Sequence, residues 1–317
     1  ESMLHLFCVM VIATRLLSAC AFVHVKGSLL QRRPVSRCMA TAAAQASAQA
    51  CADVIPVPLL TGTSNNYGYL LVDRETKRAA CVDPVEPKKL LSAAADAGAT
   101  IDTLLCTHKH WDHSGGNKEM ASLVPGIEVI STAYEDIPAV TKTMKDGDTH
   151  QMGSLTIKAL HTPCHTRGHI LFYVTKRDSN ETPILFTGDT LFVCGCGRFF
   201  EGEASEMFRA LKGVIGSLPP ETKLYCGHEY TRNNVKFALS VDPANASLQS
   251  LAQWVDDTLK KGAYTVPSTI QQELSTNPFM RVDQPALIQA ARAQDMTADE
   301  SRDVFVMKRL REMKDSF

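Results

Sequence analysis

The chain has 317 residues, of which 44% are hydrophobic and 21% charged, a composition typical of a globular protein with one large and one smaller domain. Its 33 basic and 34 acidic residues give a formal net charge of -1. This balance argues against nucleic-acid binding through a basic surface, because phosphate affinity depends on clustered Lys and Arg. A small-molecule substrate is the favoured class of partner, and we expect a monomer.

The first 52 residues differ in composition from the rest. Residues 2–52 contain no Asp or Glu and carry five basic side chains, Arg15, Lys26, Arg32, Arg33 and Arg37. An apolar stretch, too short and interrupted for a membrane span, ends in the small-residue pattern Ala19-Cys20-Ala21, which is typical of a secretory cleavage site. The Ser- and Ala-rich stretch that follows has the composition of a transit peptide.

We therefore predict that residues 1–52 are a targeting leader that is removed, and we expect no membrane attachment of the mature form. The order of a signal followed by a transit-like stretch resembles the bipartite leaders of plastids of secondary endosymbiotic origin. Mitochondrial import is the second choice. A cytoplasmic protein with a mis-assigned upstream extension is the alternative.

From Val54 onward, short apolar strands alternate with helical stretches, which predicts an α/β layered domain over residues 53–228. A hairpin is expected at Tyr67–Val72 and Ala79–Val82, a helix at Pro87–Ala97, and a helix at Ser205–Leu218. The remaining predicted strands are Thr103–Cys106, Ile127–Ser131, Leu155–Leu160, Ile170–Val174, Pro183–Phe186 and Lys223–Cys226.

After Tyr230 the pattern indicates helices alone, so we predict a smaller all-helical domain over residues 229–317. The stretch Ser247–Lys261 is amphipathic. The capping box Thr297-Ala-Asp-Glu300 is expected to open a last helix that continues through Met307 and Leu310.

The stretch THKHWDH places His108, His110, Asp112 and His113 directly after a predicted buried strand. A side chain at this position is open to a ligand and rigidly backed by the sheet. Imidazole and carboxylate suit divalent zinc, iron or manganese. A single catalytic ion usually keeps three protein ligands, so four candidates in one loop indicate that two ions are bound.

Three later strand ends supply further candidate ligands, His165 in TPCHTRGH, Asp189 in LFTGDT and His228 in LYCGHEY. Any one such histidine is more often a hydrogen-bonded structural residue than a ligand. Seven such groups at strand ends favour a metal site. His169 is interpreted as a residue that orients a ligand.

These residues resemble a known family. THKHWDH, HTRGH, TGDTLF and CGHEYT are similar to the motifs of the metallo-β-lactamase superfamily, and within it to glyoxalase II, the hydroxyacylglutathione hydrolases. The similarity runs from about Val54 to the last residue and includes DPV, GCGRFFEG and NPFMRV, which the broad fold does not require.

The resemblance implies a four-layer αβ/βα sandwich followed by a helical substrate domain. It implies that His108, His110 and His165 hold one divalent ion, with zinc favoured over iron or manganese. Asp112, His113 and His228 would hold a second ion, and Asp189 would bridge the two. The implied reaction is hydrolysis of S-D-lactoylglutathione to glutathione and D-lactate, a step of methylglyoxal detoxification, by a metal-bound water held by Asp112 and Asp189.

The family match also implies a glutathione site. Arg311 and Lys314 are three apart on the last predicted helix and match the family's RxxK signature, which would clamp the glycine carboxylate. On spacing alone, a solvated helix end explains them better. Arg198, Phe199, Phe200 and Tyr230 match the other glutathione-contacting positions. Family members commonly have Tyr where this chain has Phe200, and one lost hydrogen bond there costs on the order of 1 kcal/mol.

Three other functions compete with this interpretation. A glutathione persulfide dioxygenase of the same fold would use one iron, but such relatives generally lack the long C-terminal domain and the run Trp111-Asp112-His113. A lactonase or β-lactamase gives no reason for Arg311 and Lys314. A catalytically inactive binding module is disfavoured because the whole ligand set is present, including Asp189.

Overall fold

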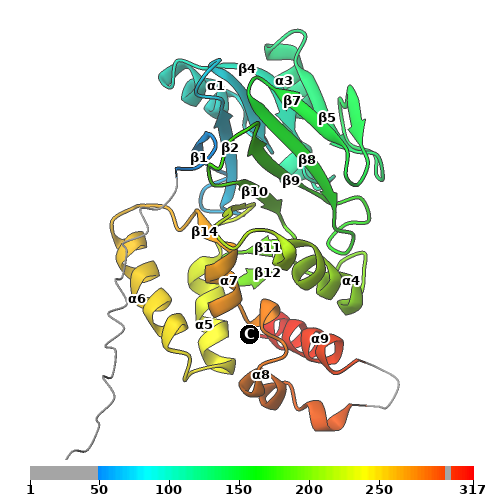
Figure 1. The fold of residues 1–317 in the computed structure, drawn as a ribbon, viewed down its shortest axis with the longest axis vertical. Helices are drawn as coiled ribbons and strands as arrows, with labels where there is room; N and C mark the ends of the chain where they lie inside the picture. The colour runs from blue at the N-terminus through cyan, green and yellow to red at the C-terminus, as the bar shows by residue number, and fades with distance from the viewer. Residues whose placement is uncertain (1–48, 297–300) are drawn as a thin grey trace, which may run out of the picture. The chain divides into compact units, whose positions relative to one another are not determined.

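The computed structural model describes residues 49–296 and 301–317, in which two six-stranded sheets pack against each other (Figure 1). The first sheet has the order β1 (Asp53–Leu59), β2 (Asn66–Val72), β3 (Arg78–Val82), β4 (Thr100–Leu105), β5 (Glu128–Thr132) and β6 (Lys142–Met144). The second has the order β14 (Ser268–Thr269), β13 (Lys223–Cys226), β10 (Ile184–Gly188), β9 (Ile170–Lys176), β8 (Leu155–His161) and β7 (Thr149–Met152). A separate hairpin joins β11 (Leu191–Phe192) and β12 (Gly195–Cys196).

Alternating side chains on the strands produce the layers, because successive residues of a strand point to opposite faces. On β2, Tyr69 and Leu71 pack into the core between the sheets, where Phe172 and Phe186 come from the second sheet. Leu70 points the other way and packs under α1 (Pro87–Asp96), which together with α3 (Asn117–Leu123) covers the first sheet. A short helix, α2 (Trp111–Ser114), precedes α3.

The outer face of the second sheet is covered by helices from later in the chain. Leu171, Leu185 and Leu224 pack there against Met207 of α4 (Ala204–Phe208) and against helices near the C-terminus. The order of layers is therefore helix, sheet, sheet, helix. This confirms the predicted four-layer α/β fold.

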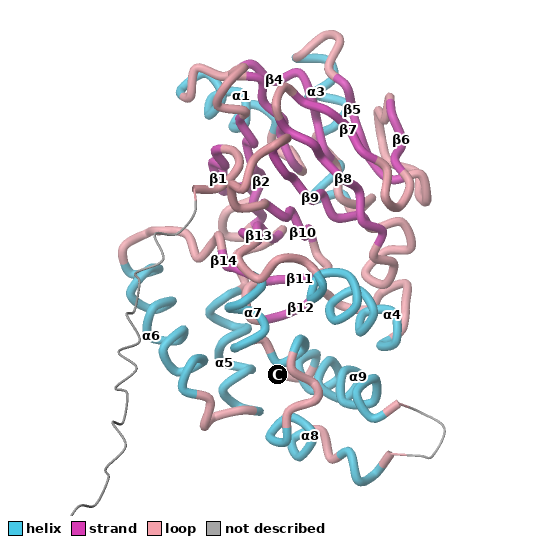
Figure 2. Tube along the Cα trace, in the orientation of Figure 1, coloured by secondary structure: helices cyan, strands magenta, loops and turns pink. Residues whose placement is uncertain are grey.

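The C-terminal part is helical, as predicted, and its helices lie beside one another in Figure 2. They are α5 (Thr231–Val241), α6 (Ala246–Lys260), α7 (Ile270–Thr276), α8 (Pro285–Ala290) and α9 (Arg302–Asp315). Short 3-10 turns at Pro278–Met280 and Ala293–Asp295 connect them. One strand, β14, interrupts the expected run of helices and pairs with β13, which ties this part to the second sheet.

One helix prediction differs from the structure in detail, and another falls partly outside the described residues. Ser205–Leu218 was expected as one helix, but α4 passes into a π-helical turn at Arg209–Val214 and a 3-10 turn at Ile215–Ser217. Gly213 and Gly216 lie in this stretch, and glycine weakens a regular helix. The expected capping box at residues 297–300 lies outside the described residues, and α9 begins at Arg302 after Ser301.

The leader prediction needs a correction at its end. The predicted leader includes residues 49–52, yet Cys51 and Ala52 are buried in the core between the sheets. The N–H of Cys51 donates to the carbonyl of Thr182 over 2.9 Å. Small apolar residues such as these pack readily in a core, and nothing in their composition distinguishes them from the Ala-rich stretch before them. The rest of the predicted leader lies outside the described residues.

No helix among residues 49–296 and 301–317 is long and apolar enough to cross a membrane.

Candidate metal centre

The ends of four strands converge on one place. β4 leads into the loop of His108 and His110, β8 into the loop of His165, β10 into Asp189 and β13 into His228. Strands β10 and β13 are parallel neighbours, with Gly188 paired to Cys226, so the loops after them lie side by side. The structure thereby brings together all seven side chains predicted as ligands. Asp112 and His113 lie on the short helix α2 rather than on a loop.

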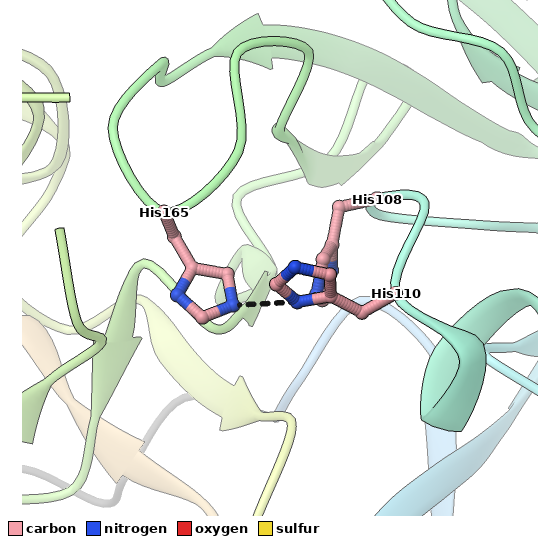
Figure 3. A group of neighbouring side chains, drawn as sticks. All are labelled: His108, His110 and His165. Atoms are coloured by element: carbon pink, nitrogen blue, oxygen red, sulfur yellow. Dashed lines mark hydrogen bonds between the residues drawn. The ribbon is translucent and has the colours of Figure 1, made fainter. Parts of the chain in front are cut away.

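The first group consists of His108, His110 and His165 (Figure 3). The Nδ1 atom of His110 lies 3.1 Å from Nε2 of His108 and 3.0 Å from Nε2 of His165. His108 and His165 are buried and His110 is partly buried. Three imidazole nitrogens from two loops thus face one point.

The second group consists of Asp112, His113 and His228. The Nε2 atoms of His113 and His228 are 3.3 Å apart, and Oδ2 of Asp112 lies 3.5 Å from Nε2 of His228. Asp189 lies between the two groups. Its Oδ2 is 3.4 Å from Nε2 of His165 and 3.2 Å from Nε2 of His228, the position expected of a bridging carboxylate.

The hydrogen bonds on the far side of the rings fix their tautomers. Nδ1 of His165 donates to the carbonyl of Arg198 over 3.0 Å, and Nδ1 of His228 donates to the carbonyl of Ser64 over 2.9 Å. Nδ1 of His113 donates to Asp83 over 2.9 Å. In each neutral ring the remaining nitrogen, Nε2, therefore carries a lone pair and no proton.

These lone pairs fit a cation. When both rings are neutral, Nε2 of His113 and Nε2 of His228 face each other as two acceptors 3.3 Å apart, an arrangement that needs a proton or a metal ion between them. Oδ1 of Asp189 is buried and accepts no hydrogen bond within residues 49–296 and 301–317, and Nε2 of His113 lies 3.4 Å from it. A buried polar atom without a partner is costly, and a metal ion would satisfy it.

The pKa shifts of His108 and His165 also favour metal binding. Burial, helped by neighbouring imidazoles, lowers the pKa of His108 well below its usual value and also lowers the pKa of His165. Both are therefore neutral, the form that binds a metal. Burial also lowers the pKa of His113, but the carboxylates of Asp189 and Asp83 outweigh it and raise the value to about 9. A divalent ion would compete with that proton.

Several residues that orient these side chains were not predicted. Asp83 accepts hydrogen bonds from His113 and from both the N–H and the hydroxyl of Thr107. Nδ2 of Asn66 donates to Oδ2 of Asp112 over 3.0 Å. Asp83 directly follows β3, so the strand-end argument that found Asp189 could have found it. Asn66 carries no comparable signal in the sequence.

His169 was predicted to orient a ligand rather than to bind a metal. Its Nε2 accepts the N–H of Asp189 over 3.1 Å, and its ring stacks on that of His108 with centroids 4.8 Å apart. It belongs to none of the groups of converging ligand atoms among the described residues. Its contacts hold Asp189 and His108 in place.

A cleft of about 410 Å³ adjoins the metal-ligand candidates. His165 and Asp189 line it together with Phe200, Tyr230, and Arg311 and Lys314 of α9. The ring of Tyr230 stacks on that of His228 with centroids 4.6 Å apart. A neighbouring cavity of about 810 Å³ shares Arg198, Phe200 and Arg311 with this cleft. Phe199 lines only the larger cavity.

The basic residues of the cleft are held by specific partners. The guanidinium of Arg311 donates to the carbonyl of Cys196 over 2.9 Å and to Asp315 over 3.0 Å, and Arg198 pairs with the same oxygen of Asp315 over 3.2 Å. Nζ of Lys314 donates to the carbonyl of Asn233 over 3.0 Å. Burial and the neighbouring Arg311 lower the pKa of Lys314 to about 8.

Known proteins similar to this chain cover both of its parts. A family model described as "Metallo-beta-lactamase superfamily" matches residues 61–228, and one described as "Hydroxyacylglutathione hydrolase C-terminus" matches residues 229–317. The cytoplasmic hydroxyacylglutathione hydrolase of Arabidopsis thaliana is 46% identical over 235 residues, which are 74% of this chain and 90% of that protein. The hydroxyacylglutathione hydrolase of a Synechococcus strain is 41% identical over 264 residues, covering 82% of this chain and 99% of that protein.

Among solved structures, a metallo-beta-lactamase from Staphylococcus aureus superimposes with a TM-score of 0.57 at 22% identity, covering 81% of this chain and 70% of the other. That likeness shows the shared fold. The sequence matches are closer, and they include the C-terminal helices as well as the sheets. The chain belongs to the hydroxyacylglutathione hydrolases (glyoxalase II), a family of the metallo-β-lactamase superfamily.

Proposed function

We propose that this protein hydrolyses the thioester of S-(2-hydroxyacyl)glutathione, typically S-D-lactoylglutathione, to glutathione and D-lactate. The observation that carries the proposal is the cleft that His165 and Asp189 line together with Arg311 and Lys314. A cleft lined by both metal-ligand candidates and cations suits a reactive thioester joined to an anionic carrier. The relatives named hydroxyacylglutathione hydrolase support the same reaction.

The proposed metal centre holds two divalent ions. Imidazole and carboxylate accept zinc, iron and manganese, and we propose zinc as the favoured occupant. His108, His110 and His165 would hold one ion and Asp112, His113 and His228 the other, with Asp189 shared. When bound, such a pair makes hydroxide available at neutral pH and polarises the carbonyl that is attacked.

The protein's own groups then have distinct tasks. Oδ2 of Asp112 and the carboxylate of Asp189 point toward the same space and can hold the attacking water by accepting its protons. Asn66 keeps Asp112 in place, and His169 does the same for Asp189. No Ser or Cys nucleophile is required, and Cys106 and Cys226 are buried with thiols directed at the carbonyls of His108 and His228.

We assign catalysis to residues 53–228 and glutathione binding to residues 229–317 together with the segment of Arg198, Phe199 and Phe200. Arg311 and Lys314 would clamp the glycine carboxylate of glutathione, and Tyr230 would supply a hydroxyl. A bound carboxylate would favour the charged form of Lys314, whose pKa of about 8 otherwise leaves it partly neutral near that pH.

The direct test is hydrolysis of S-D-lactoylglutathione by the purified full chain. Ultraviolet absorbance monitors the reaction, and the metal content of the same protein is measured. We expect thioester cleavage that is lost after metal removal and restored by zinc. Oxygen uptake with glutathione persulfide in place of thioester cleavage would instead identify the chain as a dioxygenase. If metal-loaded protein shows neither thioester cleavage nor oxygen uptake, the catalytically inactive binding module is the remaining interpretation.

We further propose that the chain is imported into an organelle, with a plastid of secondary origin favoured over a mitochondrion. The acid-free composition of residues 2–52 supports this. A fluorescent reporter joined to residues 3–48, which precede the described fold, is expected to enter an organelle. The same fusion with Arg32, Arg33 and Arg37 changed to Ala is the control and is expected to be retained outside. A diffuse signal from the unchanged fusion would contradict the proposal.

A further inference from the structure

We propose that Glu135 is a positioning residue that joins the two loops carrying all three histidines of one proposed metal site. This inference rests on the metal-binding role proposed above. Glu135 follows β5, and its side chain is only 5% exposed. Its Oε1 accepts the N–H of Lys109 over 2.8 Å and the hydroxyl of Thr166 over 3.1 Å. Its Oε2 accepts the N–H of Gly168 over 3.0 Å.

The donors lie next to the proposed ligands. Lys109 stands between His108 and His110, and Thr166 directly follows His165. One buried carboxylate therefore holds both loops, and the rings on those loops meet with nitrogen atoms 3.0 and 3.1 Å apart. Charge-assisted hydrogen bonds of this kind are stronger than neutral ones. We infer that they set the distance between His165 and the other two histidines.

Two further observations support a close contact between these loops. A Cβ atom at Gly168 would lie 2.4 Å from Cγ of Glu135, so only glycine lets the backbone approach the carboxylate this closely. Glu201 links the same two loops nearer the surface, since it accepts the N–H of Arg167 over 2.8 Å and Nζ of Lys109 over 2.7 Å. The loops are thus joined at two depths.

The other proposed site has different supports. His113 is held by Asp83, His228 by the carbonyl of Ser64, and Asp112 by Asn66. None of these contacts involves Glu135. Loss of Glu135 should therefore weaken the binding of one ion and spare the other. A general loss of stability would weaken both.

The test is Glu135→Gln, which keeps the shape of the side chain. An amide has one acceptor oxygen, so its NH₂ group must face either the donors of Lys109 and Thr166 or the donor of Gly168. Zinc affinities of the full chain are measured by competition with a chromophoric chelator. Of the two ions, we expect one to bind about ten- to a hundredfold more weakly, the usual effect of removing an outer partner of a metal ligand, and the other to be unchanged.

Asp73→Asn is the matched control. Asp73 is also buried and accepts hydrogen bonds from Glu75, Thr76 and Ser154, but it follows the end of β2 opposite to Asn66 and the metal centre. It should lower the melting temperature and leave both zinc affinities unchanged. Thr166→Val removes a single hydrogen bond and tests the same contact if Glu135→Gln fails to fold. Thr166→Val should weaken the binding of the same ion, but to a smaller degree.

The role of Glu135 would be overturned if both zinc affinities were unchanged in the Glu135 and Thr166 variants. It would also be overturned if the affinities for both ions fell equally. An Asp73→Asn protein that loses one ion selectively would overturn it as well. Wild-type protein that does not bind a pair of ions would instead refute the proposed metal centre, and this inference with it.

Discussion

Replacing Asp189 with Asn is expected to lower kcat/KM for S-D-lactoylglutathione by at least about a thousandfold, because metal centres contribute several kcal/mol and each 1.36 kcal/mol is a factor of ten in rate. Among residues 49–296 and 301–317, Asp189 is the one carboxylate that lies within 3.4 Å of histidines from both groups. Asparagine keeps its shape but removes the charge that two cations would share. The variant should also retain less metal, which elemental analysis of the purified protein measures.

The control for this variant is Asp242→Asn. Asp242 is equally buried and pairs with Arg281, away from the proposed metal ligands. Its loss should lower the melting temperature while kcat/KM and metal content stay near those of the unchanged protein. If Asp189→Asn kept full metal content and near-normal turnover, the shared-carboxylate arrangement would be wrong.

The positions of the proposed ligands could be predicted because a physical rule connects them to local sequence. Each of His108, Asp189 and His228 follows an apolar run that forms a buried strand, so a polar residue there must lie at the edge of a sheet. Nothing local identifies Glu135 in the same way. It belongs to a surface-like stretch, STAYED, and becomes important only because two other loops place their N–H groups around it.

The fold, too, has elements that local sequence predicts and elements that depend on distant contacts. Long apolar strands such as β2 and β8 were predicted within a residue or two, since their hydrophobic runs are read directly from the sequence. The hairpin of β11 and β12 has strands of two residues each, too short for a periodic pattern, and its position depends on distant partners. Asn277 donates to the carbonyl of Gly195, and Glu273 accepts the N–H of Cys194. Such long-range contacts are not visible in local sequence.

The basic residues of the cleft include one feature that the sequence predicts and one that it does not. The RxxK spacing placed Arg311 and Lys314 on one helix, but not the carboxylate that neutralises Arg311. Asp315 pairs with Arg311 and with Arg198, so the cleft is less positive than the three cations alone would make it. Removing Arg311 therefore has two consequences. It removes a donor for the substrate, and it leaves Asp315 close to the place where the substrate's carboxylate would bind.

Both consequences weaken substrate binding, so Arg311→Ala is expected to raise KM for S-D-lactoylglutathione about ten- to a hundredfold, the equivalent of the roughly 1.5–3 kcal/mol of hydrogen bonds to a charged group. The Nε–H of Arg311 is buried without a partner in the part of the chain that the structure describes, and a bound carboxylate could supply one. Arg311 contributes to none of the groups of converging ligand atoms among the described residues, so kcat should fall much less. Steady-state kinetics separate the two effects.

Arg309→Ala is the matched control for this result, because Arg309 lies on the same helix but pairs with Glu312 and lines neither cavity. It should leave KM unchanged. Arg311→Lys keeps the charge without the planar fork and should give an intermediate KM, because a point charge replaces only part of a bidentate contact. If Arg311→Ala left KM unchanged while kcat fell, the arginine would act on the hairpin through Cys196 rather than on the substrate, and the proposed clamp would be wrong.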